Sequence, residues 1–378
     1  MARQILTYLE QHRADMLADL ETLVGLESPS TEKNALDAAG RLLAGLLTAA
    51  GAKVAVLPQS TRGNHLRAEW ESDSTEGGQT LVLGHLDTVF NLGELERNPF
   101  RREAELIYGP GVSDMKGGLV CFLWAMRTLR ALGRRPRRRI VFLVTSDEEI
   151  GSESARPFIE AEARRSHATL VVEPAMADGS IKAWRKGCGQ FTITVTGRSA
   201  HSGADPGAGV SAIVEMAHQI LRLEALHAPA EGATLNVGVV TGGTRPNVVP
   251  EQAVAQVECR IATAEQGARF DAAIRSLTPV LSGTQIKVTG GIDTPSLEPR
   301  HSEPLLPLAR QVYTELGLEL KVSGSGGVSD GNLSAAVGCP TLDGLGPIGF
   351  GMHTSGEHLL VSSLWERAAV LARLLEIV

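Results

Sequence analysis

The chain has 378 residues, of which 43% are hydrophobic and 21% are charged, and its formal net charge at pH 7 is −7. This composition predicts a soluble globular protein with enough length for two domains. The mild negative charge argues against nucleic acid or a membrane surface as a partner.

The N-terminal segment has a helical pattern with charges throughout, rather than an uninterrupted apolar stretch followed by a cleavage site. We therefore expect no signal peptide, no membrane span and a cytoplasmic location. The four cysteines are widely scattered and show no Cys-x-x-Cys spacing, which predicts reduced residues with a structural role.

The first part of the chain alternates between helical and strand-like patterns. Helices are expected at residues 4–24, 34–50 and 117–132, and strands at 53–57, 65–70, 80–86, 140–145 and 168–172. Helices that alternate with short apolar strands favour an α/β architecture with a largely parallel sheet. Arginines cluster between residues 130 and 139 without interleaved aromatics, so we interpret this connector as a solvated loop rather than an anion or nucleic-acid patch.

A second pattern occupies residues 187–297. Strands are expected at 191–196, 234–240, 254–261 and 285–289, and helices at 209–226 and 264–281. The order strand, helix, strand, strand, helix, strand is the split βαβ plan of a ferredoxin-like domain. The α/β pattern resumes after Pro299, so we interpret residues 187–297 as a domain inserted between residues 1–186 and 298–378 of the first domain.

His85 and Asp87 lie near the end of the apolar strand LVLGHLDTVF, residues 81–90. Residues two apart in a strand point to the same side, so the imidazole could bind a metal through one nitrogen while the other nitrogen donates to the carboxylate. For a single His-x-Asp pair, the more ordinary interpretation is a core histidine that is hydrogen-bonded to a turn aspartate. We favour a metal ligand over a core histidine here, because further acidic and imidazole groups follow other strands.

Four further segments place such groups after predicted strands or in turns. Asp114 lies in YGPGVSDMKGG, Glu148 and Glu149 follow the strand at 140–145, Glu173 follows the strand at 168–172, and His353 lies in GFGMHTSGEH. Sites in open α/β sheets form at the carboxyl ends of the strands, so these groups can converge. Taken singly, each group has an ordinary structural explanation. Asp114 could be an N-cap, Glu148 and Glu149 a helix start, Glu173 a surface residue and His353 a loop residue.

Five of these groups could hold two metal ions that share one carboxylate: His85, Asp114, Glu149, Glu173 and His353. A mixed set of imidazoles and carboxylates suits Zn²⁺ and tolerates Co²⁺ or Mn²⁺ as substitutes. Glu148 is not needed as a ligand and stands beside one, which is the position of a general base.

The motifs GHLDTV, GPGVSDMKGG, SDEEIGS, VVEPA, SAHSG and a late MH occur in this order along almost the whole chain. Together they resemble the two-zinc amidohydrolase and exopeptidase family, which includes glutamate carboxypeptidases, acetylornithine deacetylase, succinyl-diaminopimelate desuccinylase and aminoacylases. The motif details are most similar to those of the glutamate carboxypeptidase branch. The resemblance implies a zinc-exopeptidase-like fold, with a mixed, largely parallel sheet flanked by helices and an inserted ferredoxin-like domain that serves as a lid and a dimerisation surface.

The resemblance also implies a division of labour at the metal centre. His85 and Glu173 would hold one zinc ion, and Glu149 and His353 would hold the other. Asp114 would bridge the two ions. The peptide bond from Asp114 to Met115 would be cis. Asp87 would orient His85, and Glu148 would act as the general base.

In this family the inserted domain contributes to the site of a homodimer. His201, in SAHSG, would reach the partner's site and polarise the scissile carbonyl; the alternative is a loop histidine that caps the following helix. Asn247 and Arg260 would hold the carbonyl or carboxylate of the substrate, because a guanidinium matches a carboxylate. Gly326 and Gly327 would line the substrate pocket.

These features predict a metal-dependent hydrolase that cleaves an amide bond and releases a free amino acid, as a carboxypeptidase or an N-acyl-amino-acid amidohydrolase. A metal-activated water would attack a small peptide or an N-acyl amino acid, with Glu148 as general base. A biosynthetic deacylase of the acetylornithine or succinyl-diaminopimelate type is the alternative within the family. The intact Glu148 and ligand set disfavour a noncatalytic homologue that only binds a metal or peptide.

Thr294 stands where the glutamate carboxypeptidase branch carries an arginine, so a preference for glutamate is not expected from the resemblance.

Overall fold

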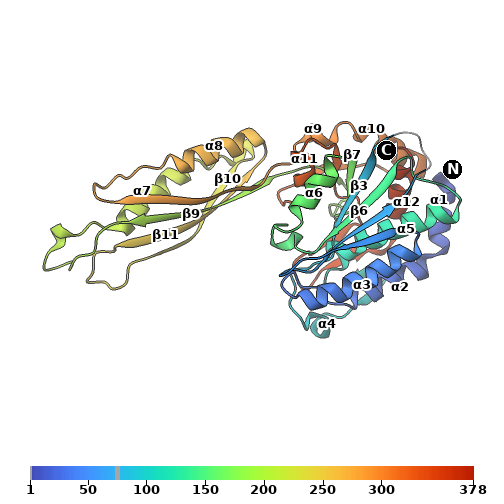
Figure 1. The fold of residues 1–378 in the computed structure, drawn as a ribbon, viewed down its shortest axis with the longest axis horizontal. Coiled ribbons are helices and arrows are strands. Elements are labelled where there is room, and N and C mark those ends of the chain that lie inside the picture. The colour runs from blue at the N-terminus through green and yellow to red at the C-terminus, as the bar shows by residue number, and fades with distance from the viewer. Residues whose placement is uncertain (1, 73–76) are drawn as a thin grey trace. The chain divides into compact units, whose positions relative to one another are not determined.

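The computed structural model describes residues 2–72 and 77–378, which divide into two compact units (Figure 1). Unit 1 comprises the chain up to Trp184 together with Glu298–Ser325 and Ser329–Val378. Unit 2 comprises Arg185–Leu297 and Gly326–Val328.

The extent of unit 2 differs slightly from the predicted 187–297. Arg185 and Lys186 belong to unit 2, and so do Gly326–Val328, which the sequence places in the first domain. The backbone of Arg185 pairs with that of Leu297 at 2.9 and 3.0 Å, and the guanidinium of Arg185 donates to the carbonyl of Val328 at 2.9 Å. These hydrogen bonds join segments far apart in the chain and leave no periodic signal in the sequence.

Unit 1 is built on a six-stranded sheet with the strand order β1-β2-β6-β3-β7-β14. β3 is parallel to β6 and β7, and β14 is parallel to β7, whereas β1 and β2 form an antiparallel edge. The strands are β1 (Lys53–Leu57), β2 (His65–Trp70), β3 (Gln79–His85), β6 (Arg139–Thr145), β7 (Ser166–Val171) and β14 (Thr341–Leu342). The mixed, largely parallel sheet predicted from the sequence is confirmed.

Every residue of β3 is buried, because helices cover both faces of the sheet (Figure 1). Val82 belongs to the core formed with α5 and α12, whereas Leu81 and Leu83 belong to the core formed with α6 and α11. Alternate residues of a strand point to opposite faces, so a strand between two helical layers is apolar along its length. The helices of unit 1 are α1 (Ala2–Gln11), α2 (Arg13–Val24), α3 (Lys33–Ala49), α4 (Glu94–Arg97), α5 (Gly118–Ala131), α6 (Arg156–Ala163), α9 (Pro299–Ser302), α10 (Leu306–Leu316), α11 (Asp330–Ala336) and α12 (Val361–Leu375).

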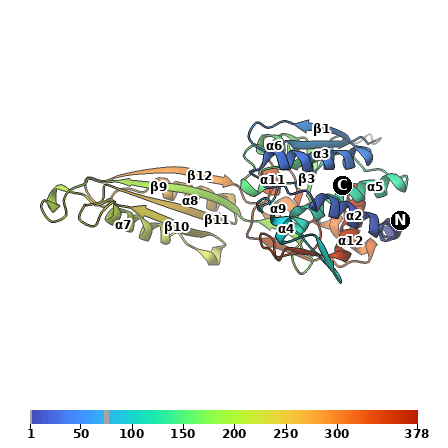
Figure 2. The same ribbon diagram turned by 90° about the horizontal axis from the view of Figure 1, so that it is seen from below.

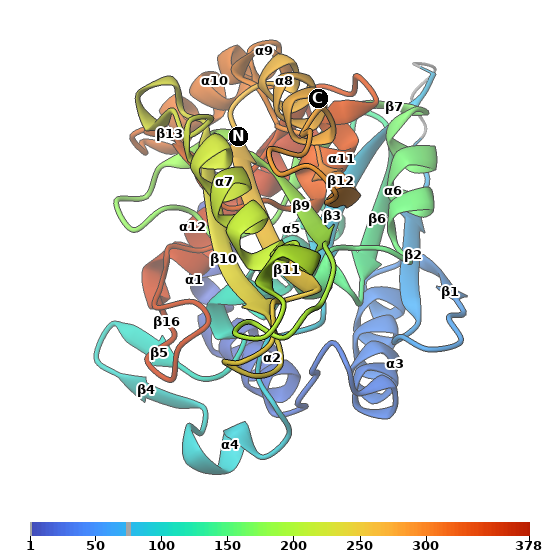
Figure 3. The same cartoon turned by 90° about the vertical axis from the view of Figure 1, so that its left-hand side faces the viewer.

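Two small sheets complete unit 1. One has the order β15-β16-β5-β4, and Figure 3 shows β16, β5 and β4 side by side. The other is the pair β13-β8. Their strands are β4 (Arg101–Glu103), β5 (Leu106–Tyr108), β15 (Gly349–Phe350), β16 (His358–Leu360), β8 (Ile181–Arg185) and β13 (Val322–Ser325). The pairing of β16 with β5 brings the loop before β16 next to the turn Val112–Gly117, which follows β5.

Unit 2 has one antiparallel sheet with the order β10-β11-β9-β12, and Figure 2 shows β12 and β10 at its two edges. α7 and α8 share one apolar core with the strands, which is the packing of a helical layer on one face of a sheet. The elements are β9 (Gly187–Thr196), α7 (Ala212–Glu224), β10 (Thr234–Gly242), β11 (Gln252–Ile261), α8 (Ala264–Arg275) and β12 (Gln285–Thr294). Their order along the chain matches the predicted ferredoxin-like plan.

One local expectation is wrong, and another needs a qualification. The helix predicted at 4–24 is broken at His12, whose ring Nδ1 lies 2.8 Å from the carbonyl oxygen of Tyr8, while its backbone N–H donates to Leu9 instead. The i→i−4 hydrogen-bond ladder is therefore interrupted at this residue. The arginine-rich connector is a loop with Arg135 and Arg137 exposed, as expected, although Arg134 pairs with Glu376 at 2.5 Å and Arg138 is buried.

The four cysteines are all buried and free of disulfide bonds, as predicted. Within the described residues, no helix has both the length and the apolar character that a bilayer crossing requires.

Candidate metal centre

Three neighbouring parallel strands end at the same edge of the unit 1 sheet. His85 is the last residue of β3 and pairs in register with Thr145, the last residue of β6. Glu148 and Glu149 begin a short helical turn directly after β6, and Glu173 follows β7. Parallel register therefore brings these groups together, as strand ends in an α/β sheet do.

Asp114 lies between two imidazoles, and each of its carboxylate oxygens faces a different one. Its Oδ1 is 3.2 Å from Nε2 of His85, and its Oδ2 is 3.4 Å from Nε2 of His353. Each imidazole also contacts a second carboxylate. Nε2 of His85 is 3.3 Å from Oε1 of Glu173, and Nε2 of His353 is 3.2 Å from Oε2 of Glu149. The cluster is thus a symmetrical chain, carboxylate, imidazole, shared carboxylate, imidazole, carboxylate.

The donor set fits divalent metal ions. Ligand atoms of His85, Asp114 and Glu149 all lie within 4.8 Å of one another. Nitrogen and oxygen donors in such a mixture suit Zn²⁺, and the shared carboxylate between two imidazoles suits a pair of ions rather than one. The residues that the sequence proposes as ligands are therefore close enough to serve together.

The carboxylates of the cluster favour positive charge on the two imidazoles, as the pKa shifts show. Hydrogen bonds to Asp114 and Glu149 raise the pKa of His353 to about 10. Burial would lower the pKa of His85, but its hydrogen bonds to neighbouring carboxylates raise it well above the usual value. Burial would likewise raise the pKa of Asp114, but hydrogen bonds from the two imidazoles lower it. Divalent cations would satisfy the same carboxylates and would leave the imidazoles neutral.

Glu148 lies next to this chain of ligands and has a perturbed pKa of its own. Burial raises the pKa of Glu148 well above its usual value; His85 opposes this, and nearby carboxylates, with that of Glu173 first, reinforce it. A carboxyl group with a raised pKa beside a metal site can both accept and return a proton near neutral pH.

Asp87 is fully buried, and its carboxylate holds the segment that carries Glu148. It accepts the backbone N–H groups of Glu148 at 3.2 Å and Glu149 at 3.1 Å, and the hydroxyl of Ser30 at 2.8 Å. The ring Nδ1 of His85 is 3.0 Å from the backbone carbonyl oxygen of Asp87 and 3.5 Å from its carboxylate. Asp87 thus contacts His85 as expected, although the shorter contact is through its backbone.

Two buried carboxylates near the cluster are absent from the sequence-based set. Asp330 accepts the hydroxyls of Thr145 and Ser152, at 2.8 and 2.5 Å, which stand on either side of the Glu148 segment. Glu357 lies four residues after His353 and contacts the turn that carries Asp114. Only its place in GFGMHTSGEH could have pointed to Glu357. The peptide bond between Asp114 and Met115 is cis, as the family resemblance implies.

The predicted substrate-binding residues all lie in unit 2. His201 and Asn247 are on exposed, adjoining segments, since His201 pairs with Val248. Arg260 lies near the other end of β11, opposite Cys188, and its guanidinium pairs with Glu258 at 2.5 Å. The two exposed glycines, Gly326 and Gly327, belong to the late segment of unit 2.

His201 has a defined ring orientation within its turn. Its Nδ1 accepts the backbone N–H groups of Gly203 at 3.1 Å and Ala204 at 3.0 Å. A neutral imidazole that accepts at Nδ1 carries its proton on Nε2, so Nε2 is a donor. The turn-capping alternative and a donor role for His201 are therefore compatible.

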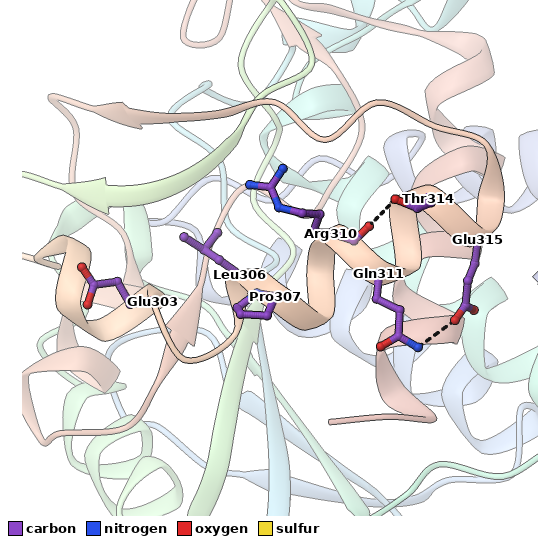
Figure 4. Close-up of a pocket in the computed structure, with 7 residues that line it drawn as sticks. All are labelled: Glu303, Leu306, Pro307, Arg310, Gln311, Thr314 and Glu315. Carbon is purple, nitrogen blue, oxygen red and sulfur yellow. Dashed lines mark hydrogen bonds between the residues drawn. The ribbon is translucent and has the colours of Figure 1, made fainter.

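A hollow on the surface of unit 1 lies along α10 (Figure 4). Leu306, Pro307 and Arg310 line one part of it, and a 2.8 Å hydrogen bond joins Gln311 to Glu315 at the other. It shares no residue with the cluster of imidazoles and carboxylates, so it is not the metal centre.

Sequence comparison places the chain among known hydrolases. A family model described as Peptidase family M20/M25/M40 matches residues 81–377. Carboxypeptidase G2 of Pseudomonas sp. (strain RS-16) is 30% identical over 372 residues, which cover 95% of this chain and 88% of that protein. Succinyl-diaminopimelate desuccinylase of Leptothrix cholodnii is 28% identical over 356 residues, which cover 89% of this chain and 92% of that protein.

Solved structures share the fold across almost the whole chain. Aminopeptidase PepT from Bacillus cereus matches with a TM-score of 0.77 and 22% identity, covering 96% of this chain and 98% of that one. A dinuclear metal binding peptidase of the M20 family from Bacillus subtilis matches with a TM-score of 0.71 and 15% identity, covering 97% and 98%.

Proposed function

The chain belongs to Peptidase family M20/M25/M40, and from this premise and its cluster of imidazoles and carboxylates we propose that it is a two-metal hydrolase that cleaves an amide bond and releases a free amino acid. Its substrate is a small peptide or an N-acyl amino acid. The observation that carries the proposal is the position of Asp114, whose two carboxylate oxygens lie 3.2 and 3.4 Å from different imidazoles.

In this proposal the cluster would hold two zinc ions, with cobalt or manganese as substitutes. His85 and Glu173 would hold one ion, His353 and Glu149 would hold the other, and Asp114 would serve both. The 3.2 and 3.3 Å separations within each imidazole–carboxylate pair support this assignment. When bound, such ions act as Lewis acids that acidify water and polarise a carbonyl.

Glu148 is the general base. It removes the proton of the attacking water and then delivers that proton to the leaving amine. The hydrogen bond from its backbone N–H to Asp87 fixes the start of its side chain relative to His85 and Glu149. Its raised pKa supports the role, because a group that must return a proton needs a pKa nearer neutrality than an ordinary glutamate has.

Unit 2 provides the groups that hold the substrate. Arg260 binds the carboxylate of the released amino acid, and the substrate must compete with Glu258 for the guanidinium. His201 donates from Nε2 to the oxyanion that forms at the scissile carbonyl, with Asn247 beside it. Gly326 and Gly327 line the pocket. Thr294 offers no guanidinium, so no preference for a glutamate side chain is expected from this position.

The geometry within unit 2 supports a homodimer. Cys188, opposite Arg260, is eight residues before Thr196 along β9, which corresponds to roughly 27 Å of extended strand. His201 lies beyond Thr196. One small substrate cannot touch both Arg260 and His201 of the same chain, so in this proposal the two residues come from different subunits, with His201 serving the site of the partner.

An exposed surface of unit 2 is suited to that dimer. β10 is an edge strand, and its Val239 and Val240 are 47% and 49% exposed. On α7, Ile213, Val214 and Leu221 are also exposed. An edge strand with exposed apolar side chains can pair with a second copy of itself, which gives a symmetric interface.

A biosynthetic deacylase is the second candidate, favoured by the similarity to succinyl-diaminopimelate desuccinylase over 89% of this chain. One substrate panel separates the two candidates. Zinc-loaded enzyme is incubated with dipeptides, N-acyl amino acids, folate-type conjugates, N-acetylornithine and succinyl-diaminopimelate, and the free amino acid is measured. Release from peptides or conjugates supports the first candidate, and release from the last two alone supports the second. Release of amino acid from any of these substrates by enzyme that elemental analysis shows to be metal-free would contradict both.

A further inference from the structure

Glu357 is a fully buried carboxylate at the end of the loop that precedes β16. Its Oε2 accepts the backbone N–H of Gly111 at 2.9 Å. Its Oε1 accepts the backbone N–H groups of Ser113 at 2.8 Å and Asp114 at 2.9 Å. One side chain thus binds three N–H groups of a single turn, and Asp114 is a member of that turn.

These three N–H groups depend on Glu357. Buried backbone donors that lack an acceptor cost free energy, and an ionised acceptor makes the stronger hydrogen bonds. The turn is an unusual one, since Gly111 has a φ of 70° and a side chain there would collide with Thr88. Glycine adopts this conformation without strain, so position 111 needs a glycine, and the carboxylate of Glu357 is the acceptor shared by all three donors.

The loop that carries Glu357 also carries His353. It connects β15 to β16 and is closed by backbone hydrogen bonds from Thr354 to Gly351 and from Glu357 to Thr354, each 3.1 Å long. The backbone carbonyl of Glu357 accepts a further N–H, from Gly109 at 3.3 Å. The loop and the turn are therefore joined on both the side-chain and the backbone atoms of one residue.

We propose that Glu357 is a positioning residue for the shared carboxylate: it ties the backbone of Asp114 to the loop that carries His353, so that both ligands approach the metals as one rigid pair. The proposal rests on the two-metal function described above. Removing Glu357 would leave every ligand in the chain but would loosen the position of Asp114, which serves both ions. Groups that orient metal ligands in this way typically change metal affinity by about 10- to 100-fold.

The competing explanation is that Glu357 only stabilises the fold. Glu162 gives a matched control, because it is also a buried carboxylate of unit 1 with several donors: Arg67 at 2.8 Å, Gln79 at 2.7 Å and Arg165 at 2.6 Å. Glu162 contacts Gln79, the first residue of β3, whereas the metal centre lies at His85, the last residue. Glu162 is therefore at the N-terminal end of the strand, away from the metal centre.

The test compares full-length wild type with Glu357→Gln, Glu357→Ala and Glu162→Gln. Metal-free proteins are titrated with zinc and with cobalt by calorimetry, the cobalt absorption spectrum is recorded, and the melting temperature of each metal-free protein is measured. Glu357→Gln retains one oxygen for the N–H groups of Ser113 and Asp114, so it should lose less affinity than Glu357→Ala. We expect losses of about tenfold and up to 100-fold, respectively, with an altered cobalt spectrum. Glu162→Gln should lower the melting temperature and leave metal affinity within about twofold, since it contacts no ligand.

The outcomes separate this inference from the proposed function. If wild type binds two ions and both Glu357 variants bind them with wild-type affinity, the positioning role is wrong and the two-metal function stands. If wild type itself fails to bind two ions, the proposed function fails. Should Glu357→Ala not fold, the isosteric Glu357→Gln decides, because an unchanged affinity in that variant overturns the inference.

Discussion

The carboxylate of Asp87 accepts the backbone N–H of Glu148 across 3.2 Å of the buried centre. The next N–H, of Glu149, reaches the other oxygen at 3.1 Å, and Nδ1 of His85 contacts the backbone carbonyl of Asp87. One residue therefore links the proposed base, a proposed ligand of one metal and a proposed ligand of the other. This arrangement assigns Asp87 a wider role than the orientation of His85 alone.

The first prediction concerns this link. In Asp87→Asn, one carboxylate oxygen becomes an NH₂ group that must face the N–H of Glu148 or Glu149, so the short segment after β6 should shift. We expect kcat to fall by about 100-fold while KM changes little, because the base and the neighbouring ligand Glu149 are displaced and the substrate contacts are not. Steady-state kinetics on zinc-loaded enzyme measures both values. A variant with unchanged kcat would show that the Asp87 hydrogen bonds do not set the position of the base.

The second prediction concerns the stability of unit 2. The buried carboxylate of Glu215 accepts the backbone N–H groups of Val280, at 3.0 Å, and Leu281, at 2.6 Å, as well as the hydroxyl of Thr284. Burial would raise the pKa of Glu215, but the backbone N–H groups of Leu281 and Val280 lower it. A lowered folded-state pKa means that this contribution is present above the unfolded-state pKa and is lost as the pH falls through the folded-state value.

Glu215→Gln should therefore destabilise the protein by about 1–3 kcal/mol at pH 7, the cost of a buried donor left without its partner. Thermal melts of both proteins across a range of pH measure the difference. The gap should narrow as the medium becomes acidic enough to protonate Glu215 in wild type. A gap that stays constant down to low pH would mean that the charge of Glu215 contributes nothing.

The third prediction tests whether His201 acts across the proposed dimer. His201→Ala and Glu148→Ala chains should each be inactive alone, but a mixed dimer would have one site with its own Glu148 and an intact His201 from the other chain. For equal amounts and random exchange, about half of the dimers are mixed and each has one competent site, so roughly a quarter of wild-type activity should return. Mass spectrometry of tagged chains verifies the exchange. Verified mixed dimers without turnover would show that His201 serves its own subunit or none.

The arrangement of the sheet could be predicted because apolar periodicity and helix–strand alternation follow directly from burial on both faces of β3. Parallel pairing then brought His85, the segment after β6 and Glu173 to one edge without any further information. Asp114 and His353 were grouped with that edge as chemically suitable donors, but only the family resemblance assigned Asp114 as the bridge and His353 to the ion shared with Glu149.

Residues that act on the backbone could not be found in this way. Glu357 is 243 residues from Asp114 and binds only N–H groups, which every residue except proline has. Asp330 similarly contacts hydroxyls of Thr145 and Ser152 from far along the chain. Neither carboxylate follows an apolar strand that would draw attention to it. For the same reason the sequence placed the start of unit 2 at residue 187, whereas the backbone hydrogen bonds between Arg185 and Leu297 include Arg185 in that unit.

The most direct test of the two-metal account is the metal content and turnover of Glu148→Gln and Glu149→Gln, measured side by side. The account predicts that Glu148→Gln retains two ions per chain and loses at least ~100-fold in kcat, because only the proton acceptor is missing. Glu149→Gln should instead bind fewer than two ions, because a proposed ligand is weakened. Exchanged phenotypes, or wild-type turnover by Glu148→Gln, would contradict the assignment of base and ligand.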